Sequence, residues 1–264
     1  MADDATLPEP PDLTKKVFDA VDEKANLPVF SMIVLGMLAG VYIGLGGLFA
    51  TVALAGADAL PFGVGQVLAG VVFALGLALV LIAGAELFTG NALMSGPVYS
   101  GQLAIGTASK ALLIVWIANL VGSVLLAVVV LAAGVHEAGD GAVGRAALDL
   151  GTTKTDKAFG TVIASGILAN MLVCLAVWLA IGGHTVTQKI VGLLLPIAAF
   201  VAVGLEHSVA NMYLLPYAYL VQLVTEGAAI SIMGIVANLV AATLGNVIGG
   251  ALVAVPYAAV YAKK

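Results

Sequence analysis

One motif occurs twice in this chain, each time inside a long apolar stretch. The segments GAELFTGN (84–91) and GLEHSVAN (204–211) both follow the pattern G-x-E-x-x-x-x-N. A second pair of fragments, NLVG from Asn119 and NLVA from Asn238, recurs at nearly the same offset. We therefore expect two homologous halves, and polar, glycine-flanked interruptions at matching places in two halves predict a transport path.

The surroundings of the two motifs are too apolar for a soluble domain. Hydrophobic residues make up 62% of the chain and charged residues only 9%, whereas a soluble domain has about 25% charged residues. The sequence therefore predicts an all-α integral membrane protein. Glu86 and Glu206 are the only carboxylates inside apolar stretches, and both belong to the repeated motif.

Composition also excludes several classes of function. The net charge of -5 is spread over the tail and loops without a basic patch, so nucleic acid is not expected as a partner. The single cysteine, Cys174, cannot form an intramolecular disulfide. No second histidine or cysteine stands at ligand spacing from His207, so we expect no metal and no cofactor. Enzymatic activity is not expected either, because clustered catalytic groups are missing.

Six apolar stretches are long enough to cross a hydrocarbon core about 30 Å thick. Because three spans per half is an odd number, the second half enters the membrane from the opposite side, which predicts a 3+3 inverted repeat. The halves cover 27–134 and 158–260, within a transmembrane channel domain of 27–264. The predicted spans are 27–55, 65–95, 105–134, 158–181, 188–222 and 229–260.

The N-terminal tail, 1–26, is acidic and contains an amphipathic segment over 13–24. This segment predicts an interfacial helix, either an anchor on the headgroups or a lid over the cytoplasmic mouth. Positive residues on one side predict that both termini lie in the cytoplasm, in a multi-pass protein of the inner membrane. They are Lys15, Lys16, Lys24, Lys110, Lys189, Lys263 and Lys264, against Arg145, Lys154 and Lys157 in the longest loop.

The second and fifth spans carry helix-breaking residues and are predicted to be broken helices. Gly84, Gly90, Gly96 and Pro97 interrupt the second span, and Pro196, Gly204 and Pro216 bracket the polar part of the fifth. Non-helical backbone at membrane depth is tolerated only where protein or a water-lined cavity covers it. We therefore expect both breaks to face each other and to define the pore.

The carboxylates of Glu86 and Glu206 need partners, because a charge in the membrane costs about 2.5 to 3.5 kcal/mol even on a lenient scale. In a structural role they would accept hydrogen bonds from backbone amides freed by the break, as caps do. Asn91 and Asn211 close each motif and are assigned to the same loop structure. The alternative is that the two glutamates carry protons directly.

His207 is the only histidine in a membrane-depth segment, and imidazole titrates near neutral pH. It can therefore act in the path, although a lone buried histidine is often only a satisfied core residue. Thr89 lies at the position that we expect to face His207 across the pseudo-twofold axis. Its hydroxyl could orient the imidazole, or it could satisfy helix backbone as threonine often does.

Four segments, AGAELFTGN, GILANMLVCLAVW, GLEHSVANMY and TLGNVIGG, resemble signature segments of the formate/nitrite transporter family in matching order and spacing. The resemblance covers essentially the whole membrane portion. It implies an aquaporin-like fold of six helices with one pore per protomer. It also implies a homo-pentamer whose central hole is not the substrate route.

The resemblance also assigns site residues by position. The family's central histidine and its threonine partner fall on His207 and Thr89, and its vestibule lysine falls on Lys154. Asn170 and Asn246 match its pathway asparagines. Its constrictions match Phe73, Leu77 and Phe200, together with Leu87 and Val173. One departure is Glu86, where some formate channels have aspartate.

These residues suggest how a small anion could cross. Removing an ion from water costs several kcal/mol, so the path needs attraction by Lys154 and helix N-termini and then neutralisation by a proton from His207. The sequence thus predicts proton-linked transport of small monovalent anions, with formate first. The alternatives are a nitrite or hydrosulfide channel of the same family and anion conduction without proton movement. A water or glycerol channel is disfavoured because paired Asn-Pro-Ala breaks are absent.

Overall fold

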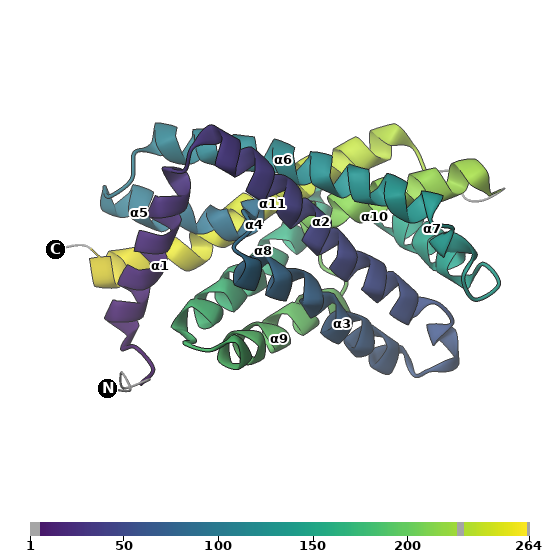
Figure 1. Cartoon of the computed structure of the whole chain (residues 1–264), viewed down its shortest axis with the longest axis horizontal. Helices are drawn as coiled ribbons and strands as arrows, with labels where there is room; N and C mark the ends of the chain where they lie inside the picture. Colours follow the sequence, from purple (N-terminus) through teal and green to yellow (C-terminus); the bar gives the residue numbers. More distant parts are fainter. Residues whose placement is uncertain (1–5, 226–229, 263–264) are drawn as a thin grey trace.

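The structure, a computed structural model, describes residues 6–225 and 230–262, and the regular elements in these ranges are all helices, with no strand (Figure 1). The all-α prediction is confirmed. The helices are α1 (Pro10–Ala25), α2 (Val29–Leu54), α3 (Phe62–Ala83), α4 (Phe88–Asn91), α5 (Ser95–Ser100), α6 (Ile105–Ala132), α7 (Ala142–Thr155), α8 (Phe159–Gly182), α9 (Val186–Ala202), α10 (Ser208–Val224) and α11 (Ile232–Tyr257).

Most of the predicted spans are single long helices. By length and composition, α2, α3, α6, α8 and the helical segment Ile232–Ala262 can each cross a membrane. The second and fifth predicted spans are both broken, as predicted: 65–95 is divided between α3 and the short helices that begin with α4, and 188–222 is divided into the two 17-residue helices α9 and α10. Residue 229, Lys263 and Lys264 lie outside the described residues.

The first segments of the two broken helices, α3 and α9, meet near the middle of the molecule. α3 and α9 pack against each other and reach the middle of the molecule from opposite ends (Figure 1). Each half repeats one pattern of neighbours, in which α2 packs on α3 and α6, and α8 packs on α9 and α11. Helix α1 and the C-terminal end of α11 lie at the same end of the molecule (Figure 1). This arrangement is consistent with an inverted repeat.

Small residues allow the helices of each half to approach closely, as is typical of membrane bundles. A Cβ atom at Gly40 of α2 would lie 2.1 Å from the Asn119 carbonyl oxygen of α6. A Cβ at Gly249 of α11 would lie 2.3 Å from the Ile167 carbonyl oxygen of α8. In each half, a glycine therefore allows the first and third helices to touch. This contact sets the position of the third helix relative to the break.

Helix α7 lies where the sequence predicted only the longest loop, so that expectation was wrong. Its buried residues include Val143, Ala147, Gly151 and Lys154, which recur at helical spacing. α7 packs against α10. This spacing is a signal of a packed amphipathic helix, and it places Lys154 against the second half of the broken span.

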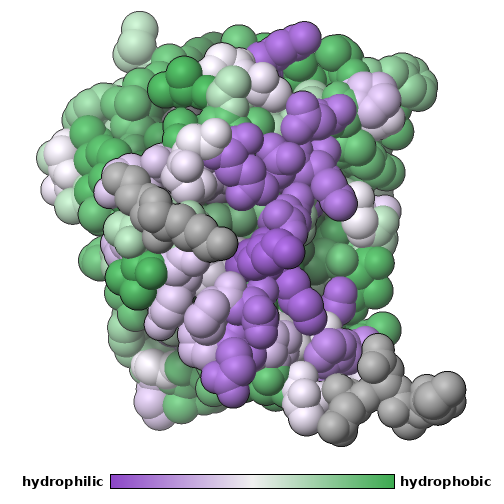
Figure 2. Space-filling model, turned by 90° about the vertical axis from the view of Figure 1, so that its left-hand side faces the viewer, coloured by the Kyte–Doolittle hydropathy of each residue, from purple (hydrophilic) through white to green (hydrophobic). Residues whose placement is uncertain are grey.

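The predicted amphipathic segment forms α1, which lies across one end of the bundle. Its inner face is buried and is formed by Thr14, Val17, Phe18 and Val21. Figure 2 views this end and shows hydrophilic residues gathered in a band, with hydrophobic residues on both sides. α1 thus presents a polar face outward while its apolar face contacts α8 and the chain that follows α4.

Candidate functional site

Each broken helix stops at a glycine in the left-handed region. α3 ends at Ala83 and the chain turns through Gly84, with φ 78°, and α9 is followed by Gly204, with φ 73°. Only glycine adopts this conformation without strain. The non-helical segments are shorter than the sequence suggested, because the three prolines lie inside helices: Pro97 in α5, Pro196 in α9 and Pro216 in α10.

One asparagine clamps the first break. Asn119 of α6 accepts a hydrogen bond from Phe88 N (2.9 Å), the first residue of α4. Its amide donates to Gly36 O of α2 (2.7 Å) and to Glu86 O in the break (2.9 Å). A single side chain therefore joins three segments of the first half.

Asn246 of α11 makes the same three bonds in the second half. It accepts from Ser208 N (2.8 Å) and donates to Gly166 O of α8 (2.8 Å) and Glu206 O (3.0 Å). The structural counterpart of Asn119 is therefore Asn246. The sequence-based pairing of Asn119 with Asn238 was wrong, because the repeated Asn-Leu-Val letters do not follow the hydrogen bonding.

The two glutamates do not accept bonds from the first freed backbone amides, contrary to the expectation for caps. Asn119 and Asn246 occupy those amides instead. The carboxylates accept from the motif asparagines: Asn91 Nδ2 lies 2.9 Å from Glu86 Oε2, and Asn211 Nδ2 lies 2.6 Å from Glu206 Oε2. Glutamate and asparagine thus form one side-chain unit in each break.

Lysines neutralise both glutamates. Lys24 of α1 donates to Glu86 Oε1. Lys154 Nζ lies 3.1 Å from Glu206 Oε2, and Lys157 Nζ lies 2.7 Å from Glu206 Oε1. Burial lowers the pKa of the Lys154 ammonium, and the Glu206 carboxylate opposes that shift. Lys154 is therefore held by Glu206.

His207 connects the two breaks. As the N-cap residue of α10, its Nδ1 accepts from Ala210 N (3.0 Å), and its Nε2 lies 2.8 Å from Thr89 Oγ1. Since Nδ1 is an acceptor, the proton of the neutral ring is assigned to Nε2, which donates to the Thr89 hydroxyl. Both side chains are buried.

Asn170 of α8 supports the same region. Its amide donates to Thr89 O (3.1 Å) and to Asn246 O (2.6 Å). Its Oδ1 is buried and has no hydrogen-bond partner in the described part of the chain. Asn170 therefore holds the Thr89 backbone and offers one available acceptor beside it.

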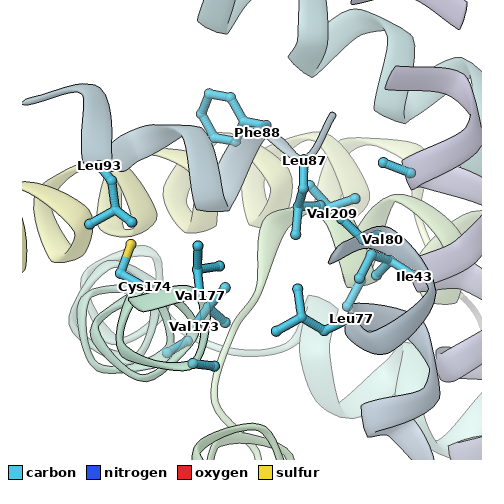
Figure 3. Packing of buried hydrophobic residues seen from close by; sticks show 14 of the residues in the cluster. Ile43, Leu77, Val80, Leu87, Phe88, Leu93, Val173, Cys174, Val177 and Val209 are labelled. Carbon is cyan, nitrogen blue, oxygen red and sulfur yellow. The ribbon is translucent and has the colours of Figure 1, made fainter. Parts of the chain in front are cut away.

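The five predicted constriction residues are all buried around the breaks. The rings of Phe73 and Phe200 meet edge to face at 5.4 Å, and the Phe200 ring lies 5.6 Å from the imidazole of His207. Figure 3 shows the others, Leu77 on α3, Leu87 in the first break and Val173 on α8. Apolar side chains therefore surround the hydrogen-bonded centre.

A cavity of about 180 Å³ reaches the first break from the end that carries α1. Ala20 and Val21 of α1 line one side, and Leu87 and Gly90 lie on either side of the Phe88–Thr89 pair. Lys24 and Lys189 also line it. A small anion entering here would meet two cationic residues before the buried centre.

Several of these residues were not found from the sequence. Asn119 was noted only as part of a repeat, and Lys24 and Lys157 only as charges that indicate topology. Asn238, which donates to Lys154 O (3.0 Å) and accepts from Asn211 (2.8 Å), was noted for the wrong pairing. Asparagine inside an apolar helix was the available signal, because a buried amide needs partners.

A helical membrane fold in which two interrupted helices meet through a buried imidazole defines a channel or transporter. The family model described as formate/nitrite transporter matches residues 11–259, and this chain belongs to that family. Its relatives are channels and transporters, not enzymes.

Curated relatives align over nearly the whole chain. The formate channel FocA of Escherichia coli K12 is 32% identical over 97% of this chain and 95% of its own. A probable formate transporter of Methanothermobacter thermautotrophicus is 36% identical over 94% of each chain. The uncharacterized transporter YrhG of Bacillus subtilis is 37% identical over 97% and 94%.

Solved structures also match. A pentameric formate channel with formate bound superposes with a TM-score of 0.78 at 33% identity, covering 85% of this chain and 93% of that one. An ion channel of the same family also gives a TM-score of 0.78, at 31% identity over 91% and 95%. The fold is therefore that of the family's channels.

Proposed function

We propose that this protein transports small monovalent anions or their neutral acids across the cytoplasmic membrane, with formate as the principal substrate. The observation that carries the proposal is the Thr89–His207 hydrogen bond between two broken helices, inside an apolar surround. The formate channels among its relatives support the choice of substrate. Nitrite and hydrosulfide are the alternatives within the family.

We assign attraction of the anion to lysines on both sides of the centre. An ion that leaves water for an apolar passage loses several kcal/mol of hydration even after relaxation. Lys24 and Lys189 line the cavity at one side, and Lys154 and Lys157 lie at the other break. These ammonium groups offset part of that cost before the anion meets Phe73 and Phe200.

The proton step is assigned to His207. In the tautomer described above the neutral ring donates to Thr89 and has no second proton to give. A proton must therefore reach the ring first, and the resulting N–H at Nδ1 would face Ala210 N–H, donor against donor. Binding of the proton thus loosens the cap of α10, and an arriving anion favours it by stabilising the imidazolium.

Transfer of that proton to formate yields neutral formic acid and restores the neutral ring. The acid then crosses the constriction without a charge, and the Oδ1 acceptor of Asn170 is available to its hydroxyl. If His207 only donates a hydrogen bond, the same path conducts anions without moving protons. The hydrogen bond from Ala210 N to His207 Nδ1, which assigns the proton of the neutral ring to Nε2, is the observation that favours this second reading.

We also propose that the protein assembles as a homo-pentamer in the lipid bilayer, with both termini in the cytoplasm. Large apolar side chains such as Leu113 and Val129 are exposed along the spanning helices. Such a surface requires lipid or neighbouring protomers. The solved pentameric relative supports the second arrangement for part of it.

Stopped-flow uptake by purified protein in liposomes tests this function. Formate, nitrite, hydrosulfide, acetate and lactate are supplied in turn, and formate is expected to enter fastest. The variant His207→Phe should lose proton-linked uptake yet elute as the same oligomer in size-exclusion chromatography. His184→Phe, at an exposed loop position, is the matched control. Unchanged formate uptake by His207→Phe would refute the role of the imidazole.

A further inference from the structure

The two breaks differ in how many cations hold their glutamate. Among the residues that the structure describes, Glu86 has one ammonium partner, Lys24, whereas Glu206 has two, one on each carboxylate oxygen. If Lys24 left Glu86, the buried carboxylate would remain unneutralised. If one lysine left Glu206, the other would still neutralise it. Glu206 can therefore release one of its two lysines and still be neutralised by the other.

Lys157 is the lysine suited to exchange. Its side chain is 26% exposed, against 11% for Lys154, and Glu206 is fully buried. Lys157 donates to Glu206 Oε1 and to Gly204 O (3.1 Å), so one of its three N–H groups has no partner among the described residues. An arriving anion can bind this group first and then compete with Glu206.

We propose that Lys157 forms an anion-binding subsite at the mouth beside α7, in addition to the position that the family resemblance assigns to Lys154. The ligand is a small monovalent oxyanion such as formate, and the inference rests on the proposed transport function. Lys157 holds the anion at the mouth while Lys154 keeps Glu206 neutralised. Asp156, the neighbouring acid, is exposed and forms no ion pair within the described residues, so it does not occupy this ammonium.

The proposal predicts a one-sided effect. Lys157→Gln removes the charge while its amide can still donate to Gly204 O. Loss of one charge about 4 Å from the anion, at an effective dielectric close to that of water, weakens binding about fivefold. The half-saturating formate concentration should therefore rise about fivefold for entry from the α7 side and change less than about twofold from the other side.

Radiolabelled formate uptake into right-side-out and inside-out membrane vesicles measures the two directions separately. For each variant, the ratio of the maximal rate of formate uptake to its half-saturating concentration must be the same in the two vesicle orientations at equal pH. This follows because a passive path cannot drive net flux. Lys157→Arg should retain the unmodified values. Arg145→Gln removes an exposed α7 charge that donates to Asp140 O, and it should leave both directions unchanged.

The outcomes separate this inference from the proposed function. An effect of Lys157→Gln confined to one vesicle orientation, and weaker at 1 M salt where charges are screened, supports the subsite. Equal change in both orientations, or no change, overturns it while formate transport stands. Absence of formate uptake by the unmodified protein removes the proposed function itself. Size-exclusion chromatography of each variant confirms that assembly is intact before its uptake is compared.

Discussion

The first and second breaks have the same scaffold and different chemistry. Each begins at a left-handed glycine and is clamped by an asparagine that makes the same three bonds. The residue before the second helix half is Leu87 in one break and His207 in the other. The duplicated elements build the path, and the unique imidazole gives it a titratable group.

The difference at this position also affects how the second helix half begins. Leu87 has no acceptor, so α4 has no side-chain cap. His207 caps α10 through its Nδ1. A cap contributes about 1 kcal/mol, so the imidazole both stabilises α10 and joins it to Thr89. The proton transfer that we propose for His207 is therefore linked to a structural role in one break only.

The largest expected effect tests whether the two clamps are equivalent. Asn119→Ala and Asn246→Ala each leave two buried backbone groups of the break without a partner, at roughly 1 to 3 kcal/mol each, and also remove a third bond to a helix carbonyl. We expect each variant to lose about 4 kcal/mol of unfolding free energy, measured by SDS titration in mixed micelles. Asn26→Ala, at an exposed amide, should lose less than about 0.5 kcal/mol. A tenfold difference in unfolding equilibrium between the two clamp variants would show that the halves are not equivalent.

A smaller effect should distinguish the breaks by their ion pairs. Glu206→Gln leaves two lysines beside a neutral buried side chain, and breaking such a pair costs about 3 kcal/mol. Glu86→Gln leaves only Lys24, which is 32% exposed and can turn to solvent, so we expect about 1 kcal/mol. The same SDS titration measures both variants. Equal losses would contradict the difference in charge environment.

The smallest effect should again be equal in both breaks. Gly84→Ala and Gly204→Ala place a Cβ in open space, since beyond the two adjacent residues no atom of the described part of the chain lies within 4 Å of that Cβ. Only the left-handed backbone is then strained, at about 1 kcal/mol each. Thermal unfolding in detergent should show similar small shifts for the two variants. A much larger loss at one glycine would reveal packing that the other break lacks.

The sequence predicted the breaks and the residues at their centre because these features are local. Glycine and glutamate repeated at fixed spacing marked both interruptions, and the only membrane-depth histidine marked the site. The contact between Thr89 and His207 followed from the duplication itself. A glycine can adopt a left-handed turn without steric cost, so a helix break marked by glycine can be predicted from the local sequence.

What the sequence did not predict depends on contacts between distant segments. The clamp by Asn119 requires α6 to pack against α2 within one residue of a particular register, and no local pattern specifies that. α7 was missed because its polar face and its glycines resemble a loop. Lys24 and Lys157 were counted only as topology signals, since only tertiary packing brings Lys24 to Glu86 and Lys157 to Glu206.

Simultaneous recording of internal pH and current on liposomes under a formate gradient tests the central claim most directly. Protein-free liposomes and the His207→Phe variant provide the background for formic acid that crosses lipid unaided. We predict that the unmodified protein acidifies the interior by about one proton per formate taken up, with no net current. Current without protein-dependent acidification would contradict proton transfer at His207.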